Sequence, residues 1–260
     1  EKKSLPKTVI KLTDEIYQKG EKEKNSPQML KAYAWRMKYR EMLNPDSLYA
    51  GLKGLEQWVK QTDQPMDRAI LHSLIAGIYA NYAANNQWQL RQRTEIVGQT
   101  PSADIREWTA NMFVEKVRTN VKEALADSVL LLKTSSRDYI PFVELGKTSE
   151  YYHHDLYHLL ASRGIDALLQ VEKLGSGYTE TNAVNPVKQD IIAIYGNMLS
   201  AYKAAGLKEG YVLTALNYLE WRRGAERYIR PLQVKGEASV LTDDTYLKAL
   251  NTLKSKYASE

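Results

Sequence analysis

Apolar residues recur three and four positions apart along almost the whole chain, and this spacing restricts the possible folds more than any other feature. The pattern i, i+3, i+4, i+7 gathers apolar side chains on one face of an α-helix. It is clearest in residues 9–16, 30–37, 71–78 and 212–219. No run of alternating β-branched residues predicts a strand, and Pro141 makes residues 139–143 a connector. The sequence therefore predicts an all-α fold.

Prolines and capping residues predict where the helices begin and end. Ser26, Asn44 and Asn185 each precede a proline, which places a capping side chain before a residue whose missing N–H costs nothing. Gly206 follows two alanines, at a position where a left-handed residue would end a helix. We expect helices at roughly residues 5–24, 27–43, 45–61, 64–84, 103–133, 150–173, 186–205, 207–223 and 243–258.

The spacing of the helices points to a repeat architecture. The predicted starts at 27 and 64 lie 37 residues apart, near the period of about 34 of tetratricopeptide repeats, although their full consensus is absent. We therefore predict stacked antiparallel helix hairpins forming a tetratricopeptide-like α-solenoid with degenerate repeats. Residues 1–260 are expected to form a single helical-repeat domain, with a candidate flexure near 134–149, where polar residues and Gly146 interrupt the pattern.

Charge and cysteine content exclude several classes of protein. The net charge of +5 is spread along the chain, and the densest basic stretch, which holds Arg222, Arg223, Arg227 and Arg230, also contains glutamates. This stretch is typical of a solvated helix face, so we predict no nucleic-acid partner. The chain has no cysteine, which excludes disulfides and thiolate chemistry. No apolar run approaches the roughly 18 residues that would span a bilayer.

One histidine cluster has the spacing of zinc ligands. His154 and His158 are four residues apart in a predicted helix, His153 precedes them, and Asp155 stands where a zinc hydrolase carries a general base. However, aspartate is shorter than the usual glutamate, and the only other histidine, His72, is distant in sequence. We interpret the cluster as surface or boundary histidines and His72 as a core or interface histidine. The sequence predicts no metal site, no cofactor, no catalytic residue and hence no enzyme.

Tyrosine and tryptophan are abundant, at 18 and 5 residues against 2 phenylalanines. Trp35 and Tyr39 share a helix face, as do Tyr218 and Arg222, with Trp221 nearby. Such pairs occur both in helix packing and in platforms for sugar rings. Packing is the favoured interpretation, and the sequence assigns no binding residue.

Several segments resemble a known family. They are residues 5–17, 23–32, 36–40, 69–76, 86–94, 104–108 and 156–163. Together they resemble the N-terminal helical region of the large alpha-2-macroglobulin-family proteins of Bacteroides-type bacteria. The resemblance covers roughly residues 5–170 and carries no catalytic signature. Members of that family are envelope-associated or secreted and entrap proteases, usually through a thioester between a Cys and a Gln.

The resemblance implies a non-catalytic interaction or scaffold module of a bacterial protease inhibitor. Since the chain has no cysteine, the thioester would lie outside it. The expected partners are other domains of the same large polypeptide or an envelope protein, with a membrane reached only through an anchor outside this chain. The expected location is the cell envelope, at the periplasm or outer membrane, or outside the cell, with any signal sequence already removed. The alternative is a helical-repeat glycan-binding protein of the cell envelope.

Overall fold

The computed structural model describes residues 5–94, 101–146, 149, 152, 154–174, 185–226 and 243–257. The regular elements in these ranges are helices, which confirms the all-α class for the part of the chain described. They are α1 (Leu5–Lys22), α2 (Ser26–Leu43), α3 (Ser47–Gln61), α4 (Pro65–Asn85), α5 (Gln87–Arg91), η1 (Ile105–Glu107), α6 (Ala110–Ala124), α7 (Ser128–Lys133), η2 (Ser136–Tyr139), α8 (Leu156–Val171), α9 (Pro186–Ala205), α10 (Lys208–Glu226) and α11 (Asp243–Tyr257).

Contacts between residues divide the chain into two compact units. Unit 1 comprises Glu1–Gly146 and His154–Gly177, and unit 2 comprises Lys147–His153 and Tyr178–Glu260. Each unit has its own helix packing. The single domain expected from the sequence stays a prediction.

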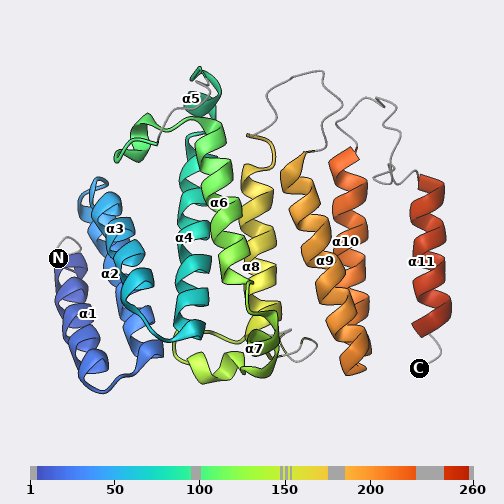
Figure 1. Cartoon of the computed structure of the whole chain (residues 1–260), viewed down its shortest axis with the longest axis horizontal. Helices are drawn as coiled ribbons and strands as arrows, with labels where there is room; N and C mark the ends of the chain where they lie inside the picture. The colour runs from blue at the N-terminus through green and yellow to red at the C-terminus, as the bar shows by residue number, and fades with distance from the viewer. Residues whose placement is uncertain are drawn as a thin grey trace. The chain divides into compact units, whose positions relative to one another are not determined.

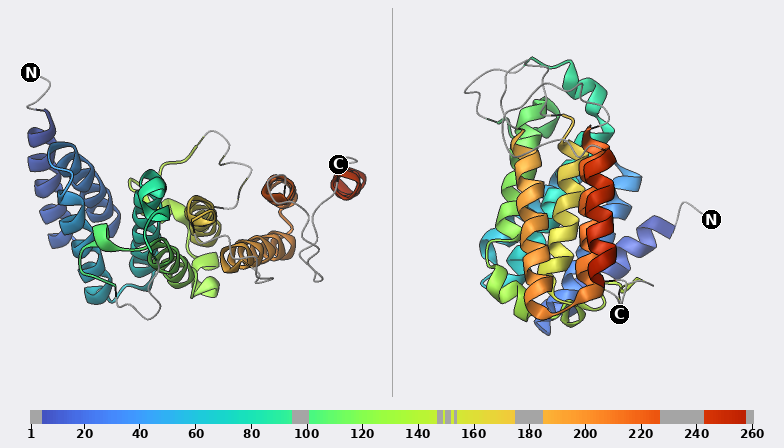
Figure 2. Two further views of the ribbon diagram at one scale, coloured as in Figure 1. Left: turned by 90° about the horizontal axis from the view of Figure 1, so that it is seen from above. Right: turned by 90° about the vertical axis from the view of Figure 1, so that its right-hand side faces the viewer.

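Unit 1 is built around α4. This helix contacts α3 on one side and packs against α6 and α8 on the other, while α1 packs along α2 (Figure 1 and Figure 2). Eleven of the 21 residues of α4 are buried. A helix that is apolar on most of its sides needs neighbours on most of them, and α3, α6 and α8 supply these.

Aromatic rings fill the contact between α4 and α6. Phe113 of α6 is fully buried, and its ring centroid lies 5.3 Å from that of Trp108 and 5.4 Å from that of Tyr82 on α4. Tyr79 stacks on Trp108 at 5.3 Å. The indole N–H of Trp108 donates to the backbone carbonyl of Ser102 at 2.7 Å, so the one polar atom of this buried ring is satisfied.

A second aromatic group joins the first three helices. Tyr17, Tyr33 and Trp58 come from α1, α2 and α3, with centroids 5.7–6.1 Å apart. The guanidinium of Arg36 lies over both tyrosine rings and pairs with Asp14 at 2.9 Å. These contacts fix α2 against its neighbours through cation–π and ring packing.

Unit 2 consists of α9, α10 and α11, each in contact with the next (Figure 1). Tyr195 of α9 lies 5.1 Å from Tyr218 and 6.2 Å from Trp221 of α10. Tyr211 of α10 contacts Tyr257 of α11, with centroids 5.6 Å apart. Tyr218 and the nearby Trp221 therefore take part in helix packing, which was the favoured interpretation for these aromatic residues.

The predicted helix ends are confirmed at some positions and wrong at others. Asn185 accepts a hydrogen bond from the N–H of Val187, and Gly206 ends α9 with a φ of 70°. At α2 the cap is Asn25, one residue earlier than predicted. Asn44 does not begin a helix, because its side chain accepts from the N–H of Asp46 in the turn before α3. Apolar spacing finds a helix, but local hydrogen bonds set its ends.

The helix predicted at 103–133 is not continuous. The segment before α6 contains only the short η1, because Trp108 leaves the helical path to enter the core. A second break separates α6 from α7, where Asp127 caps a new helix by accepting from the N–H of Leu130 at 3.0 Å. The short α5 lies in a stretch for which no helix was predicted.

Backbone hydrogen bonds close the loop that contains the candidate flexure. The N–H of Ser136 donates to the carbonyl of His154 at 2.7 Å, and the N–H of Leu156 donates to the carbonyl of Thr134 at 2.9 Å. Both ends of the loop are thereby joined in unit 1. Flexure near 134–149 stays a prediction.

Candidate functional site

Unit 1 has a groove over α4, bordered by α2 and the start of α3 on one side and by α8 on the other. It has a volume of about 670 Å³, within the range of about 300–1,000 Å³ of ligand sites. A smaller hollow of about 250 Å³ adjoins it between α4, α8 and residues 142–144. Three residues line both cavities: Ser73, Leu74 and Arg163.

Two small residues of α4 lie in the groove. Ser73 is 6% exposed, and its hydroxyl has no hydrogen-bond partner among the described residues. Gly77 lies one turn further along, and a Cβ placed there would meet nothing within 4 Å. Glycine inside a helix costs up to about 1 kcal/mol relative to alanine. No described neighbour requires a glycine here, but its lack of a side chain lets a ligand approach the backbone of α4 closely.

Arg163 and Asp166 of α8 carry the charge on the opposite side of the groove. Arg163 is solvent-exposed and has no hydrogen bond or ion pair with any described residue. Even so, desolvation by the surrounding walls lowers the pKa of Arg163, because an open concavity surrounds the guanidinium with protein while leaving it accessible. Desolvation likewise raises the pKa of Asp166, and the charge of Arg163 partly offsets that increase.

Amide and phenol groups form the remaining polar wall. Asn81 and Asn85 lie one turn apart on α4, joined by a weak side-chain hydrogen bond of 3.4 Å. The hydroxyl of Tyr33 donates to the carbonyl of Gly51 at 2.9 Å, so it is already satisfied. Asparagine side chains have two donors and an acceptor, which match the amides of an extended peptide.

The groove therefore offers unmatched donors, amides and room beside a helix backbone. Within the described residues, Ser73 accepts or donates no hydrogen bond, so no base is placed to activate its hydroxyl. Such a surface is suited to binding a polar ligand. Searches against protein-family models, curated proteins and solved structures find no match to this chain.

None of the groove residues was predicted to be a site residue from the sequence. Arg163 and Ser73 lay in segments that carry the family resemblance, but neither was given a binding role. One available signal was Gly77, since a glycine in the middle of a strongly apolar helix needs a reason. Arg163 is unpaired because of the side chains that surround it after folding, and these neighbours cannot be predicted from the spacing of residues in the sequence.

The expected helical pairing of His154 and His158 is wrong. α8 begins at Leu156, and Asp155 is its cap, accepting from the backbone N–H of His158 at 2.7 Å. The other oxygen of Asp155 lies 2.7 Å from Nδ1 of buried His158. Thus His154 precedes the helix, and Asp155 has a structural role.

His153 lies outside the described residues. Among the residues that are described, there is no group of three His, Asp or Glu side chains placed to hold a metal ion.

His72 is an interface histidine, as predicted. Its Nδ1 lies 2.9 Å from Oδ1 of Asn120, across the contact between α4 and α6. The amide of Asn120 donates to the carbonyl of Lys116 at 2.8 Å, which leaves its oxygen as the acceptor for His72. Nδ1 must therefore carry the proton.

Asn120→Ala should lower the free energy of unfolding by about 1 kcal/mol, because it removes the acceptor for His72. Urea denaturation measures the loss. In a His72→Ala background the same substitution should cost clearly less. Equal losses in both backgrounds would show that the two side chains do not interact.

The basic stretch at the end of α10 is engaged within unit 2. Arg223 pairs with Asp243 at 3.1 Å and lies over the ring of Tyr246, and Arg222 lies over the ring of Tyr218. Arg227 and Arg230 lie outside the described residues. The two described arginines of this stretch therefore contact tyrosine rings and a carboxylate within unit 2.

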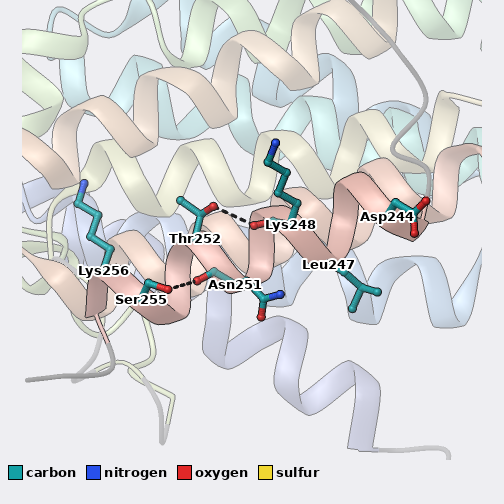
Figure 3. Close-up of a pocket in the computed structure, with 7 residues that line it drawn as sticks. All are labelled: Asp244, Leu247, Lys248, Asn251, Thr252, Ser255 and Lys256. Atoms are coloured by element: carbon teal, nitrogen blue, oxygen red, sulfur yellow. Dashed lines mark hydrogen bonds between the residues drawn. The ribbon is translucent and has the colours of Figure 1, made fainter.

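A hollow on α11 is a weaker candidate. Figure 3 shows its lining side chains, all of which project from this one helix, among them Leu247, Lys248 and Asn251. Thr252 and Ser255 donate to backbone carbonyls one turn earlier in α11. Since the described residues provide no opposing wall, they do not enclose a ligand in this hollow. Among the helices described, none is long and apolar enough to cross a bilayer.

Gly77→Ala should raise the free energy of unfolding by about 0.5–1 kcal/mol, because it adds helix propensity where a methyl group meets open space. Gly54→Ala is the matched contrast. Its Cβ would lie 2.0 Å from the hydroxyl oxygen of Tyr33, so it should lower stability by about 1–3 kcal/mol. Thermal unfolding of both variants tests whether Gly77 faces open space. A loss of stability in Gly77→Ala would mean that other protein atoms fill the groove at this position.

Proposed function

We propose that this chain is a non-catalytic interaction module that binds an extended polypeptide segment in the groove of unit 1. The observation that carries the proposal is the groove itself, where Ser73 and Arg163 have no described partner and Gly77 leaves the backbone of α4 approachable. Unmatched polar groups in a concavity gain most when a ligand supplies their hydrogen bonds. A peptide has both the length and the alternating donors and acceptors for such a site.

We propose further that the module belongs to a bacterial alpha-2-macroglobulin-like protease inhibitor. Support comes from the resemblance of residues 5–170, and the lack of cysteine puts any thioester elsewhere in the parent molecule. The bound segment then comes from another domain of the same polypeptide or from an envelope protein, and the location is the cell envelope or the exterior. The packed helices of unit 1 form, in this proposal, a tetratricopeptide-like solenoid whose inner face is the groove.

Reading the gene downstream tests the family assignment. A long region of β-sandwich domains carrying a Cys and Gln thioester motif would support it. A stop codon soon after Glu260 would refute it. This test is independent of the groove.

Selection of random peptides on the whole chain tests the binding role. Peptides should be enriched, and Gly77→Leu should weaken their binding at least about tenfold, because its side chain fills the groove. Gly196→Leu is the matched control, since a Cβ at this α9 glycine also meets nothing within 4 Å. Enriched peptides that bind both variants equally well would place the interaction elsewhere.

A glycan ligand is the second candidate, and one observation favours it. Trp35 is 37% exposed and stacks on Tyr39, with ring centroids 5.7 Å apart and an interplanar angle of 18°. Exposed stacked rings on one helix face suit a sugar ring. Quenching or protection of Trp fluorescence across an oligosaccharide panel, lost in Trp35→Ala, would establish this role instead.

A further inference from the structure

We propose that the groove contains a carboxylate-binding subsite formed by Arg163 and Ser73, so that the bound segment presents either an acidic side chain or its C-terminal carboxylate. This inference rests on the proposed peptide-binding function and names the chemical group that the groove selects. The subsite lies where the larger groove meets the smaller hollow, since Arg163 and Ser73 line both.

Arg163 supplies the charge. Its guanidinium has five N–H donors in a planar fork, and none of them has a partner among the described residues. The surrounding walls have already removed part of its hydration. A carboxylate fits the fork with two parallel hydrogen bonds, which are the strongest that this side chain makes.

Ser73 supplies a second donor. A buried serine inside a helix commonly donates to the carbonyl one turn earlier, but the hydroxyl of Ser73 makes no hydrogen bond within the described part of the chain. A buried hydroxyl without a partner is unfavourable, because it has lost its hydrogen bonds to water and gained none in return. At the junction of the two cavities the guanidinium of Arg163 can only donate, and the hydroxyl of Ser73 is able to donate as well, so a ligand group that accepts from both is favoured.

The other charged groups near the junction do not already fill this role. Glu144 in the smaller hollow pairs with Lys31 at 3.0 Å, and Asp46 at the groove pairs with Arg106 at 3.4 Å. Lys38 lies over the ring of Trp35, and Glu41 is exposed. Asp166 lines the larger groove but not the smaller hollow, and it repels a ligand carboxylate.

Asp166 makes it possible to distinguish a carboxylate ligand from the most similar alternative ligand group, a neutral amide. An amide would accept from Arg163 and donate to Asp166, so removing either charge would weaken its binding. A carboxylate gains from Arg163 and loses to Asp166. Arg163→Gln and Asp166→Asn must therefore act in opposite directions if the subsite takes a carboxylate.

The experiment uses the whole chain and two random-peptide display libraries, one with free peptide C-termini and one without. The tightest peptide from each is synthesised with its carboxylate intact and with that group converted to the amide. Conversion should weaken binding to the wild type about 10- to 100-fold. Enrichment of Asp or Glu at one position identifies a side chain as the source, and enrichment only with free C-termini identifies the terminus.

The variants locate the effect. Arg163→Gln should bind the acid and the amide peptides equally and weakly, Ser73→Ala should lose about three- to tenfold, and Asp166→Asn should bind the acid peptide more tightly. Arg91→Gln, at an exposed arginine outside the groove, should match the wild type. Thermal unfolding of Arg163→Gln should change little, because Arg163 makes no hydrogen bond or close ion pair and loses only its charge interaction with the exposed Asp166.

Peptides that bind in a Gly77-dependent manner but tolerate the amide, or that weaken in Asp166→Asn, overturn the subsite and leave the proposed function standing. If neither library yields a peptide, both are overturned. If Arg91→Gln and Arg163→Gln lost the same amount of peptide affinity, the effect would come from the net charge of the protein. That result would also overturn the subsite.

Discussion

Phe113→Ala should lower the free energy of unfolding by about 3–5 kcal/mol, because it removes a fully buried aromatic side chain from the core of unit 1. Phe113 is fully buried between α6 and α4, with the rings of Trp108, Tyr82 and Tyr79 around it at 5.3–6.3 Å. Removing the ring leaves a cavity that rigid aromatic neighbours cannot close. The rings of Trp108, Tyr82 and Tyr79 also lose their aromatic contacts with Phe113.

Phe142 is the matched control, because it is the only other phenylalanine of the chain and is half-buried beside the smaller hollow. Phe142→Ala should cost about 1 kcal/mol, in proportion to the smaller area removed from water. Denaturant titration of the two variants gives the comparison. Similar losses would mean that Phe113 is not at the centre of the core.

Asp67→Ala should lower the free energy of unfolding by about 3 kcal/mol. Asp67 is 4% exposed in the first turn of α4 and accepts hydrogen bonds from the hydroxyls of Ser26 and Tyr139, at 2.5 and 2.9 Å. Removing the carboxylate leaves both hydroxyls without their acceptor. Burial raises the pKa of Tyr139, and the charge of Asp67 raises it further, so Asp67→Ala should also bring that pKa closer to its ordinary value.

Ser26→Ala and Tyr139→Phe separate the two contacts, and each should cost about 1–2 kcal/mol. Adding either change to Asp67→Ala should cost much less than it does alone, because its partner is already gone. Additive losses would show that Asp67 does not join these segments. Ultraviolet titration of the tyrosines follows the pKa of Tyr139 in the same variants.

Asp67 also bears on the proposed binding site. It joins the start of α4 to the first residue of α2 and to η2, and α2 and α4 border the groove. Asp67→Ala should therefore weaken peptide binding even where the protein stays folded. That loss would act through the spacing of the helices, whereas Arg163→Gln acts on the ligand directly.

Most of the helices followed from the sequence because apolar spacing is a local property. The predicted ranges for α1 to α4 and α9 to α11 agree with the structure to within a few residues. The prediction failed where a single side chain overrode the spacing. Trp108 enters the core and interrupts the helix predicted at 103–133, and Asp155 caps α8 and delays its start to Leu156. The histidine pairing failed with that boundary.

The sequence by itself determined the all-α class, the lack of thiol chemistry and the absence of a concentrated basic run, because composition and periodicity are properties of neighbouring residues. Only the tertiary structure decided that Ser73 and Arg163 meet at one groove without partners, since they are 90 positions apart and lie on α4 and α8. Whether a polar group is satisfied depends on every atom around it after folding. That is why the candidate site, unlike the helices, could not be read from the chain.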